Sequence, residues 1–348
     1  MSLILSRMQN FRAASRLDQW EERASRYGAL NLFARQTDSP TGIITEDLQR
    51  KAQMAQGNTL ETMVYDKDAS VTIGSSRPVT VSDDENTTAM QSITFTTYQF
   101  GFTMIPAQYS NNETDYQRDF NYKLTKHVNK LMATLDTACD TVLNTNKTQV
   151  FSNQLGYTVA ANILTATDTE RLRLFADLNP MFMANDFNEP RHVVGNAGVQ
   201  SIILEIAEQG LYNQQNRAIQ WADKEFHFTT RIADAANKQA TGYAVMDDCL
   251  GMVYRHSRDA MMRHTTGNGY QFSVQQVPGI PVPMDVMYYD NVADKNALTG
   301  AATADLTATK VEGYSFAVDI AFVTNYNSDL ATYSQPIIKF NIDTDDTL

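Results

Sequence analysis

The chain has 348 residues, of which 43% are hydrophobic and 20% charged, a composition typical of folded proteins rather than disordered ones. It carries 28 basic and 40 acidic residues, and the resulting net charge of −12 argues against a nucleic-acid binder. With only Cys139 and Cys249, no disulfide framework is expected, and no apolar run is long enough for a signal peptide or a membrane span.

The first predicted element is an amphipathic helix over residues 3–30, with Gly28 as its expected end. Arginines dominate its polar surface, so residues 1–35 have a charge balance of +3, whereas residues 284–348 have a balance of −7. A basic amphipathic helix can bind a membrane or a nucleic acid, but three acidic residues dilute this one. We therefore expect it to dock on protein. The basic and acidic ends could also pair between neighbouring copies, or simply be solvated.

Between residues 60 and 105, apolar and polar residues alternate, which predicts β-strands. A turn-rich stretch at Gly74–Pro78 and a polar, acidic loop at Asp83–Thr88 interrupt this alternation. A ribbon of about 45 residues with so little apolar content makes a poor core by itself. It therefore needs another surface to lie on, and a neighbouring subunit is the simplest candidate.

A long amphipathic helix is predicted over residues 112–147, because apolar residues recur there in steps of three and four. Asn112 is the expected N-cap, and Glu113 and Asp115 place negative charge at the positive end of the helix dipole. At 1.5 Å per residue this helix would run about 45–50 Å. Such a helix does not fit inside one compact core, so it indicates a flat, elongated subunit built along it.

Helices and strands alternate in the rest of the chain. Thr167–Glu170 predicts a capping box in front of a helix, and Pro180 is the expected start of a second short helix. A strand at 192–194 precedes a helix that should end at Gly210. Alternating apolar residues predict further strands near 226–232, 270–274, 314–322 and 337–342.

No residues stand at the spacing of a known catalytic or metal site. The histidines are scattered, with no pair at ligand spacing: they are His127, His192, His227, His256 and His264. Gly195 and Gly198 lack the lysine and spacing of a phosphate loop and are expected in a turn. Asp247–Asp248 and Asp343–Asp346 could bind a divalent cation, but neither has calcium-loop spacing, and an acidic surface is the simpler interpretation. We therefore predict no catalytic, metal or cofactor-binding residues.

Taken in order, these elements resemble the major capsid proteins of tailed bacteriophages, the Hong Kong 97-type shell fold. Short phrases add to the resemblance: Leu131–Asp136, Val193–Asn196, Phe226–Phe228 and Thr241–Ala244. It implies an α+β fold with an N-terminal arm, an E-loop β-hairpin, a long spine helix, and peripheral and axial domains. The implied divisions are the N-terminal arm (1–44), the E-loop and flanking strands (45–110), the spine helix and start of the peripheral domain (111–165), the axial domain (166–255), and the peripheral domain with C-terminal strands (256–348).

The resemblance implies a structural protein, not an enzyme, that assembles into pentamers and hexamers of an icosahedral shell around a double-stranded DNA genome. Its implied location is the virion, after assembly in the bacterial host cytoplasm. The implied partners are a portal and, because no long cleavable segment follows Met1, a separate scaffolding protein. The acidic net charge predicts only weak contact with packaged DNA. No membrane contact is expected.

Contacts between subunits are expected from three aromatic residues of the N-terminal arm and four charged residues of the E-loop: Phe11, Trp20, Tyr27, Arg77, Asp83, Asp84 and Glu85. Lys67 is the only lysine of the E-loop itself (about 58–100), but nothing identifies a cross-linking partner, so no cross-link is predicted. Two alternatives stay open: an encapsulin-like nanocompartment of the same fold, and a β-rich enzyme or binding protein. Neighbouring genes, or microscopy of the purified protein, would distinguish them.

Overall fold

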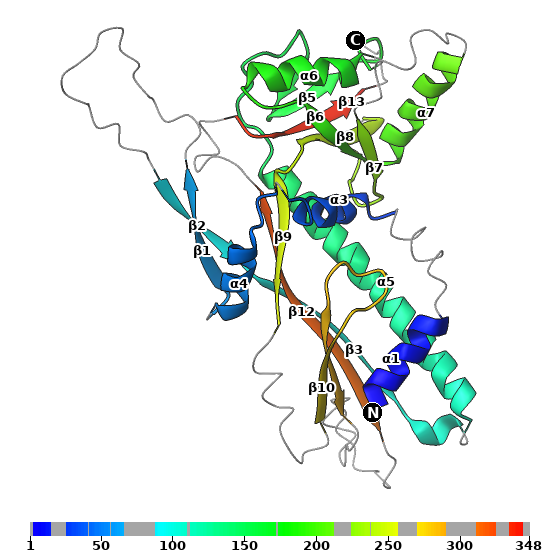
Figure 1. Cartoon of the computed structure of the whole chain (residues 1–348). Helices are drawn as coiled ribbons and strands as arrows, with labels where there is room; N and C mark the ends of the chain where they lie inside the picture. The colour runs from blue at the N-terminus through cyan, green and yellow to red at the C-terminus, as the bar shows by residue number, and fades with distance from the viewer. Residues whose placement is uncertain are drawn as a thin grey trace, which may run out of the picture.

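A computed structural model describes residues 3–14, 26–40, 42–55, 57–65, 88–109, 112–171, 173–211, 224–236, 238–256, 270–289, 311–324 and 334–343. Figure 1 shows an elongated molecule whose longest helix, α5 (Glu113–Thr145), runs along much of its length. Within the described residues, the strands form a two-stranded, a five-stranded and a six-stranded sheet. The predicted mixture of helices and sheets in an α+β chain is confirmed.

Helix α5 confirms the prediction made from its apolar period. The short 3-10 helix η1 (Pro106–Tyr109) leads into it. The side-chain oxygen of Asn112 accepts hydrogen bonds from the backbone N–H groups of Thr114 (3.1 Å) and Asp115 (3.3 Å), so Asn112 is the N-cap as expected. The buried stripe of the helix includes Phe120, Leu124, Val128, Leu131, Leu135 and Cys139. This stripe packs against the five-stranded sheet and the N-terminal helices.

The five-stranded sheet is built around one long strand, β12 (Glu312–Thr324). Strand β3 (Thr96–Met104) pairs with one edge of β12. On its other edge, β12 pairs first with β11 (Met284–Tyr289) and then with β9 (Leu250–Arg255). Strand β10 (Tyr270–Gln275) pairs with β11, and all these pairs are antiparallel.

The six-stranded sheet lies at the opposite end of the molecule from η1 (Figure 1). Its strands, in spatial order, are β4 (Thr158–Ala160), β5 (Ile163–Ala166), β13 (Ile337–Ile342), β8 (Ala240–Met246), β6 (Pro190–Gly195) and β7 (Glu225–Phe228). The β13–β5 and β6–β7 pairs are parallel, and the others are antiparallel. One face packs on α6 (Leu174–Ala184) and α7 (Ala197–Leu211), whereas side chains of the other face join the core around α5.

Two sequence predictions about helix starts differ from the structure. The Glu170 carboxylate does accept hydrogen bonds from the Thr167 N–H (3.0 Å) and hydroxyl (2.9 Å), but this pair lies in a turn before the helix, because α6 begins at Leu174 with Arg173 as its N-cap. The prediction that Pro180 begins a second helix was wrong, since Pro180 lies inside α6. The helix continues across it because Leu178 and Phe182, on either side of the proline, are both buried against the sheet.

The N-terminal region contributes three described helices: α1 (Leu3–Ala14), α3 (Gly28–Thr37) and α4 (Glu46–Met54). The prediction that Gly28 ends a helix was wrong, because Gly28 begins α3. A Cβ atom on Gly28 would lie 2.6 Å from backbone atoms of Phe228 in β7. Glycine is required there for close contact with the sheet and not to terminate a helix.

Strands β1 (Thr59–Tyr65) and β2 (Thr88–Thr94) form an antiparallel ribbon directed away from the body of the molecule (Figure 1). The base of this ribbon is buried against α4, β9 and β12 in a small separate core. The alternating segments predicted around Gly74, and the acidic residues 83–87, lie outside the described residues.

Candidate functional site

The ribbon of β1 and β2, called the arm below, is anchored at its base. Leu60, Ile93 and Phe95 are buried there. The Arg255 guanidinium lies 4.6 Å from the Phe95 ring centroid and donates a 3.0 Å hydrogen bond to Asp319 of β12. In the described part of the chain, β1 and β2 pair in a sheet with each other alone. A two-stranded ribbon is marginally stable in water, so the arm is suited to a surface beyond its own sheet.

A second feature joins α3 to the spine helix α5 through a buried carboxylate. The N-cap of α3 is Tyr27, whose side chain makes no capping hydrogen bond. Asp136 of α5 takes that role, because it accepts a 2.9 Å hydrogen bond from the Leu30 N–H in the first turn of α3. Asp136 also accepts a hydrogen bond from the Thr229 hydroxyl, just after β7. Burial raises the pKa of this carboxyl, although both hydrogen bonds oppose the shift.

Helix α1 docks on the other end of α5 through a basic residue. The Arg7 guanidinium forms an ion pair with Glu113 and lies 4.2 Å from the ring centroid of Tyr116. The Tyr116 hydroxyl in turn donates a hydrogen bond to Glu312 at the start of β12. Met8, one residue along α1, is buried in the same core. Helix α1 is therefore held on α5 of the same chain by charge, stacking and apolar contact.

Two of the seven residues predicted between subunits are described. Phe11 is buried in the core of its own chain. Tyr27 is half-buried, and its hydroxyl donates a 3.2 Å hydrogen bond to the Asn129 carbonyl of α5. The others lie outside the described residues: Trp20, Arg77, Asp83, Asp84 and Glu85. A role of these seven residues in contacts between subunits stays a prediction.

The structure brings together two histidines that the sequence leaves far apart. Strands β6 and β7 run parallel, with His192 opposite Glu225 in register. His227 lies two residues beyond Glu225 and shares its face of the sheet, because side chains alternate along a strand. The His227 Nε2 atom is 3.3 Å from His192 Nδ1. The expectation of scattered histidines was therefore wrong for this pair, since only the pairing of β6 with β7 makes them neighbours.

Charged side chains surround this group. Asp247 accepts a 2.9 Å hydrogen bond from His192 Nε2, and Arg35 of α3 forms an ion pair with Glu225 at 2.7 Å. Burial, together with the neighbouring His192 and Arg35, lowers the pKa of His227 to about 4, so its imidazole is neutral at physiological pH.

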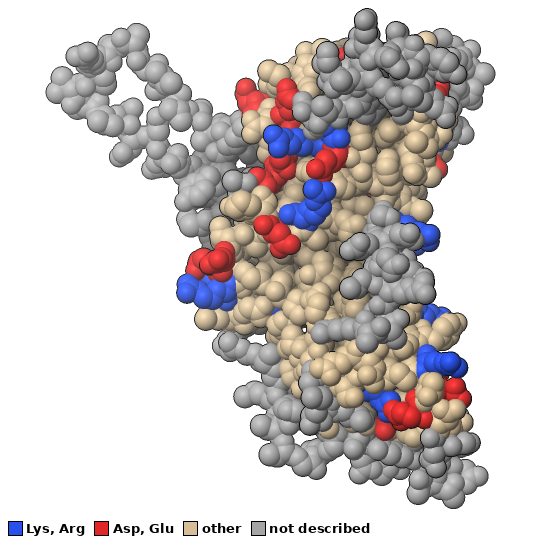
Figure 2. All heavy atoms as spheres, turned by 45° about the vertical axis from the view of Figure 1, so that its right-hand side comes forward, with Lys and Arg blue, Asp and Glu red and all other residues tan. Residues whose placement is uncertain are grey.

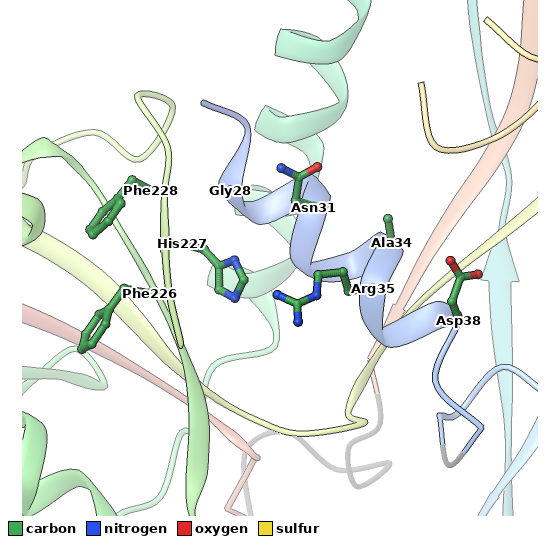
Figure 3. A pocket seen from close by; sticks show the side chains of 8 residues that line it. All are labelled: Gly28, Asn31, Ala34, Arg35, Asp38, Phe226, His227 and Phe228. Carbon is green, nitrogen blue, oxygen red and sulfur yellow. The ribbon is translucent and has the colours of Figure 1, made fainter. Parts of the chain in front are cut away.

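A cavity of about 420 Å³ lies beside the histidines, between α3 and β7. It is lined by Gly28, Asn31, Ala34, Arg35, Asp38, Phe226, His227 and Phe228. Figure 3 shows the His227 ring directed toward α3 and Arg35, whereas the rings of Phe226 and Phe228 point to the other side of the strand. One imidazole of the group is thus reachable from the surface.

The surface charge of the visible face is mixed. Figure 2 shows basic and acidic side chains gathered in small adjoining groups, with no continuous basic area among the described residues of that face. Ion pairs of this kind include Arg191–Asp247 (3.3 Å) and Lys51–Asp47 (2.9 Å). Such a surface offers little to a nucleic-acid backbone. In the described part of the chain, no helix has the length and apolar character needed to cross a membrane.

No protein-family model and no curated protein matches this sequence. Solved structures do match, over most of the chain. A structure of Mycobacterium phage Che8 is 9% identical, with a TM-score of 0.47, over 85% of this chain and 88% of that one. The capsid structure of cyanophage P-SCSP1u is 9% identical, with a TM-score of 0.46, over 83% and 85%.

The asymmetric unit of the bacteriophage PhiM1 mature capsid is 12% identical, with a TM-score of 0.46, over 89% of this chain and 91% of that one. The chain is thus similar to phage capsid structures along most of its length.

Proposed function

We propose that this protein is the major capsid protein of a tailed bacteriophage, a structural subunit without enzymatic activity whose copies build an icosahedral shell. One observation carries the proposal: a 33-residue spine helix and a projecting two-stranded arm belong to the same elongated subunit. In an isolated globular protein, an arm that projects from the core has no surface to pack on. In a shell, every subunit has a neighbouring copy on which its arm can pack.

The energetics of the arm support this role. A two-stranded ribbon gains independent stability only when a third strand or another surface covers it. Contact of the arm with a different surface of the next copy is heterologous, and such contacts form rings when the rotation from copy to copy closes. Rings of five and six subunits then generate a closed container. Much of the stability of the arm would come from assembly and not from the fold of one chain.

The regions of the chain take definite roles in this proposal. Residues 1–44 are the N-terminal arm, 45–110 the E-loop with its flanking strands, and 111–165 the spine helix with the start of the peripheral domain. Residues 166–255 form the axial domain, and residues 256–348 the peripheral domain with the C-terminal strands. Phe11, Trp20 and Tyr27, with the charged E-loop residues, contribute contacts between subunits.

The proposed partners follow from the same role. A portal and a separate scaffolding protein would direct assembly in the bacterial host cytoplasm, and the finished subunit would reside in the virion. Packaged DNA is contacted weakly, because the chain carries a net charge of −12. No observation favours a nanocompartment that encloses enzymes instead of a genome, so we do not propose that function.

The test shortens the arm without altering its base. Tyr65 and Thr88 are directly opposite in the β1–β2 pair, so residues 66–87 can be replaced by an Asn-Gly hairpin turn. We expect folded subunits, with unchanged circular dichroism, that fail to form closed shells in negative-stain electron microscopy. A matched control keeps the length of 66–87 but scrambles its sequence, which separates reach from specific contact. Normal shells from the shortened variant would refute the role of the arm.

A further inference from the structure

We propose that His192, Glu225 and His227 form a binding site for one divalent transition-metal ion of the zinc class. The inference rests on the geometry of β6 and β7 and is independent of the shell proposed above. His192 Nδ1 lies 3.7 Å from Glu225 Oε2, and His227 Nε2 lies 3.9 Å from the same oxygen. The two nitrogens are 3.3 Å apart. Three ligand atoms, one from each of these side chains, therefore converge on one point.

The three separations fit the bond lengths of zinc. A circle through three atoms with sides of 3.3, 3.7 and 3.9 Å has a radius of about 2.1 Å. Zinc bonds to imidazole nitrogen and carboxylate oxygen are about 2.0–2.2 Å long. One ion at the centre of this circle therefore reaches all three ligand atoms, without movement of either strand.

The chemistry of the donors selects the class of metal. His192 donates its Nε2–H to the Asp247 carboxylate, which leaves the Nδ1 lone pair directed to the group. A carboxylate that holds the far nitrogen of a ligand histidine is the usual support of a metal site. Two imidazoles and one carboxylate suit zinc and its neighbours, whereas magnesium and calcium prefer oxygen ligands alone.

The sheet and the cavity provide rigidity and access. All three side chains project from paired strands, so their spacing is set by backbone hydrogen bonds. The His192 and His227 side chains are only 8% and 10% exposed, whereas Glu225 is half exposed. The cavity between α3 and β7 leads to His227 (Figure 3), which leaves room for water as a further ligand.

Arg35 would compete with a metal ion for the Glu225 carboxylate. Its guanidinium lies 2.7 Å from Glu225 Oε2, the same oxygen that faces the histidines. The Arg35 side chain is 61% exposed, so it can swing into water when an ion takes its place. Other charges nearby are Asp247 and its ion-pair partner Arg191. Metal binding would therefore exchange the α3–β7 ion pair for a link between β6 and β7.

The experiment titrates ZnCl₂ into the full-length protein, after chelator treatment, by isothermal calorimetry. Cobalt binding, followed by visible absorption, reports the coordination number, and MgCl₂ is the comparison salt. We expect one zinc ion per chain and no measurable magnesium binding. H192Q and H227Q should each weaken zinc binding at least about tenfold. The control H127Q removes a histidine of α5 that lies outside the group and should leave the affinity unchanged.

Arg35→Ala should change the zinc affinity in the opposite direction to the histidine variants. Removal of this cation should tighten zinc binding by about twofold to fivefold, the effect of one partly exposed charge. A misfolded protein cannot mimic that gain, so R35A decides the question even if a histidine variant fails to fold. Zinc binding that is absent in the wild type, or unchanged in H192Q, H227Q and R35A, would overturn the proposal. The histidines would then only form a hydrogen-bonded chain to Asp247.

Discussion

Substitution of Asp136 by alanine should loosen α3 from the spine helix. Asp136 is 0% exposed, and its partners Leu30 and Thr229 are 1% and 2% exposed, so water cannot replace the lost hydrogen bonds. Each buried donor left without an acceptor costs about 1–3 kcal/mol. Two such donors predict a decrease in the free energy of unfolding of roughly 2–6 kcal/mol. The lower part of this range applies if removal of a buried charge offsets part of the loss.

The assay is urea denaturation of unassembled subunits, followed by circular dichroism, with hydrogen exchange of α3 amides as a local readout. The control Thr137→Ala changes the exposed neighbour of Asp136 on the same helix and should stay within about 0.5 kcal/mol of the wild type. Asp136→Asn keeps an acceptor for the Leu30 N–H and should therefore lose less than Asp136→Ala. If D136A unfolds within about 0.5 kcal/mol of the wild type, Asp136 does not hold α3.

The pH dependence of Asp136→Asn adds a second check. Burial raises the folded-state pKa of Asp136 above its usual value, so the folded state binds a proton more readily than the unfolded state. The contribution of this group to stability is therefore full below the unfolded pKa and declines as pH rises through the folded pKa. The asparagine variant lacks this decline. Relative to the wild type, its stability should improve from acidic to neutral pH, and a constant difference would contradict the assigned shift.

Three further predictions concern packing and charge. Gly28→Ala should lower the thermal midpoint, although alanine normally favours a helix by about 1 kcal/mol, because its Cβ would lie 2.6 Å from the Phe228 backbone; an increase would contradict that contact. Phe120→Ala should lower the urea-derived stability by about 3–5 kcal/mol, since this ring is fully buried under the spine, whereas Tyr122→Ala on the exposed side should change little. The purified protein should bind duplex DNA only weakly and lose that binding as salt rises, because the net charge is −12; tight, salt-resistant binding in gel-shift titrations would refute the structural role.

Local patterns were sufficient to predict the parts of the fold that depend on near neighbours in sequence. The spine helix was predictable because its apolar stripe repeats along consecutive turns and its cap, Asn112, bonds residues two and three positions away. The strand that became β12 was equally clear from its alternation. In both cases the residues of the element itself are enough to predict it, and the rest of the molecule only covers its apolar face.

Contacts between distant segments explain what the sequence could not predict. Gly28 looked like a helix end because the sequence does not reveal that the Phe228 backbone lies against it. The grouping of His192 with His227 depends on a parallel pair whose strands are connected through α7. The role of Asp136 as the cap of another helix was hidden for the same reason. The Glu-x-His pattern at Glu225–His227 is visible in the sequence. Its pairing with β6, which brings His192 beside it, is not.

The position of β13 in the six-stranded sheet predicts that this strand is added after the others have formed. This strand lies between β5 and β8, and its Phe340 pairs with Leu164, about half the chain length away. Without β13, the β4–β5 hairpin and the β8–β6–β7 group have no strand in common. Pairings of such long range form slowly, because loop closure must come before the contacts that reward it. We therefore expect the sheet to be joined late, when β13 inserts between β5 and β8 after the local elements on both sides have formed.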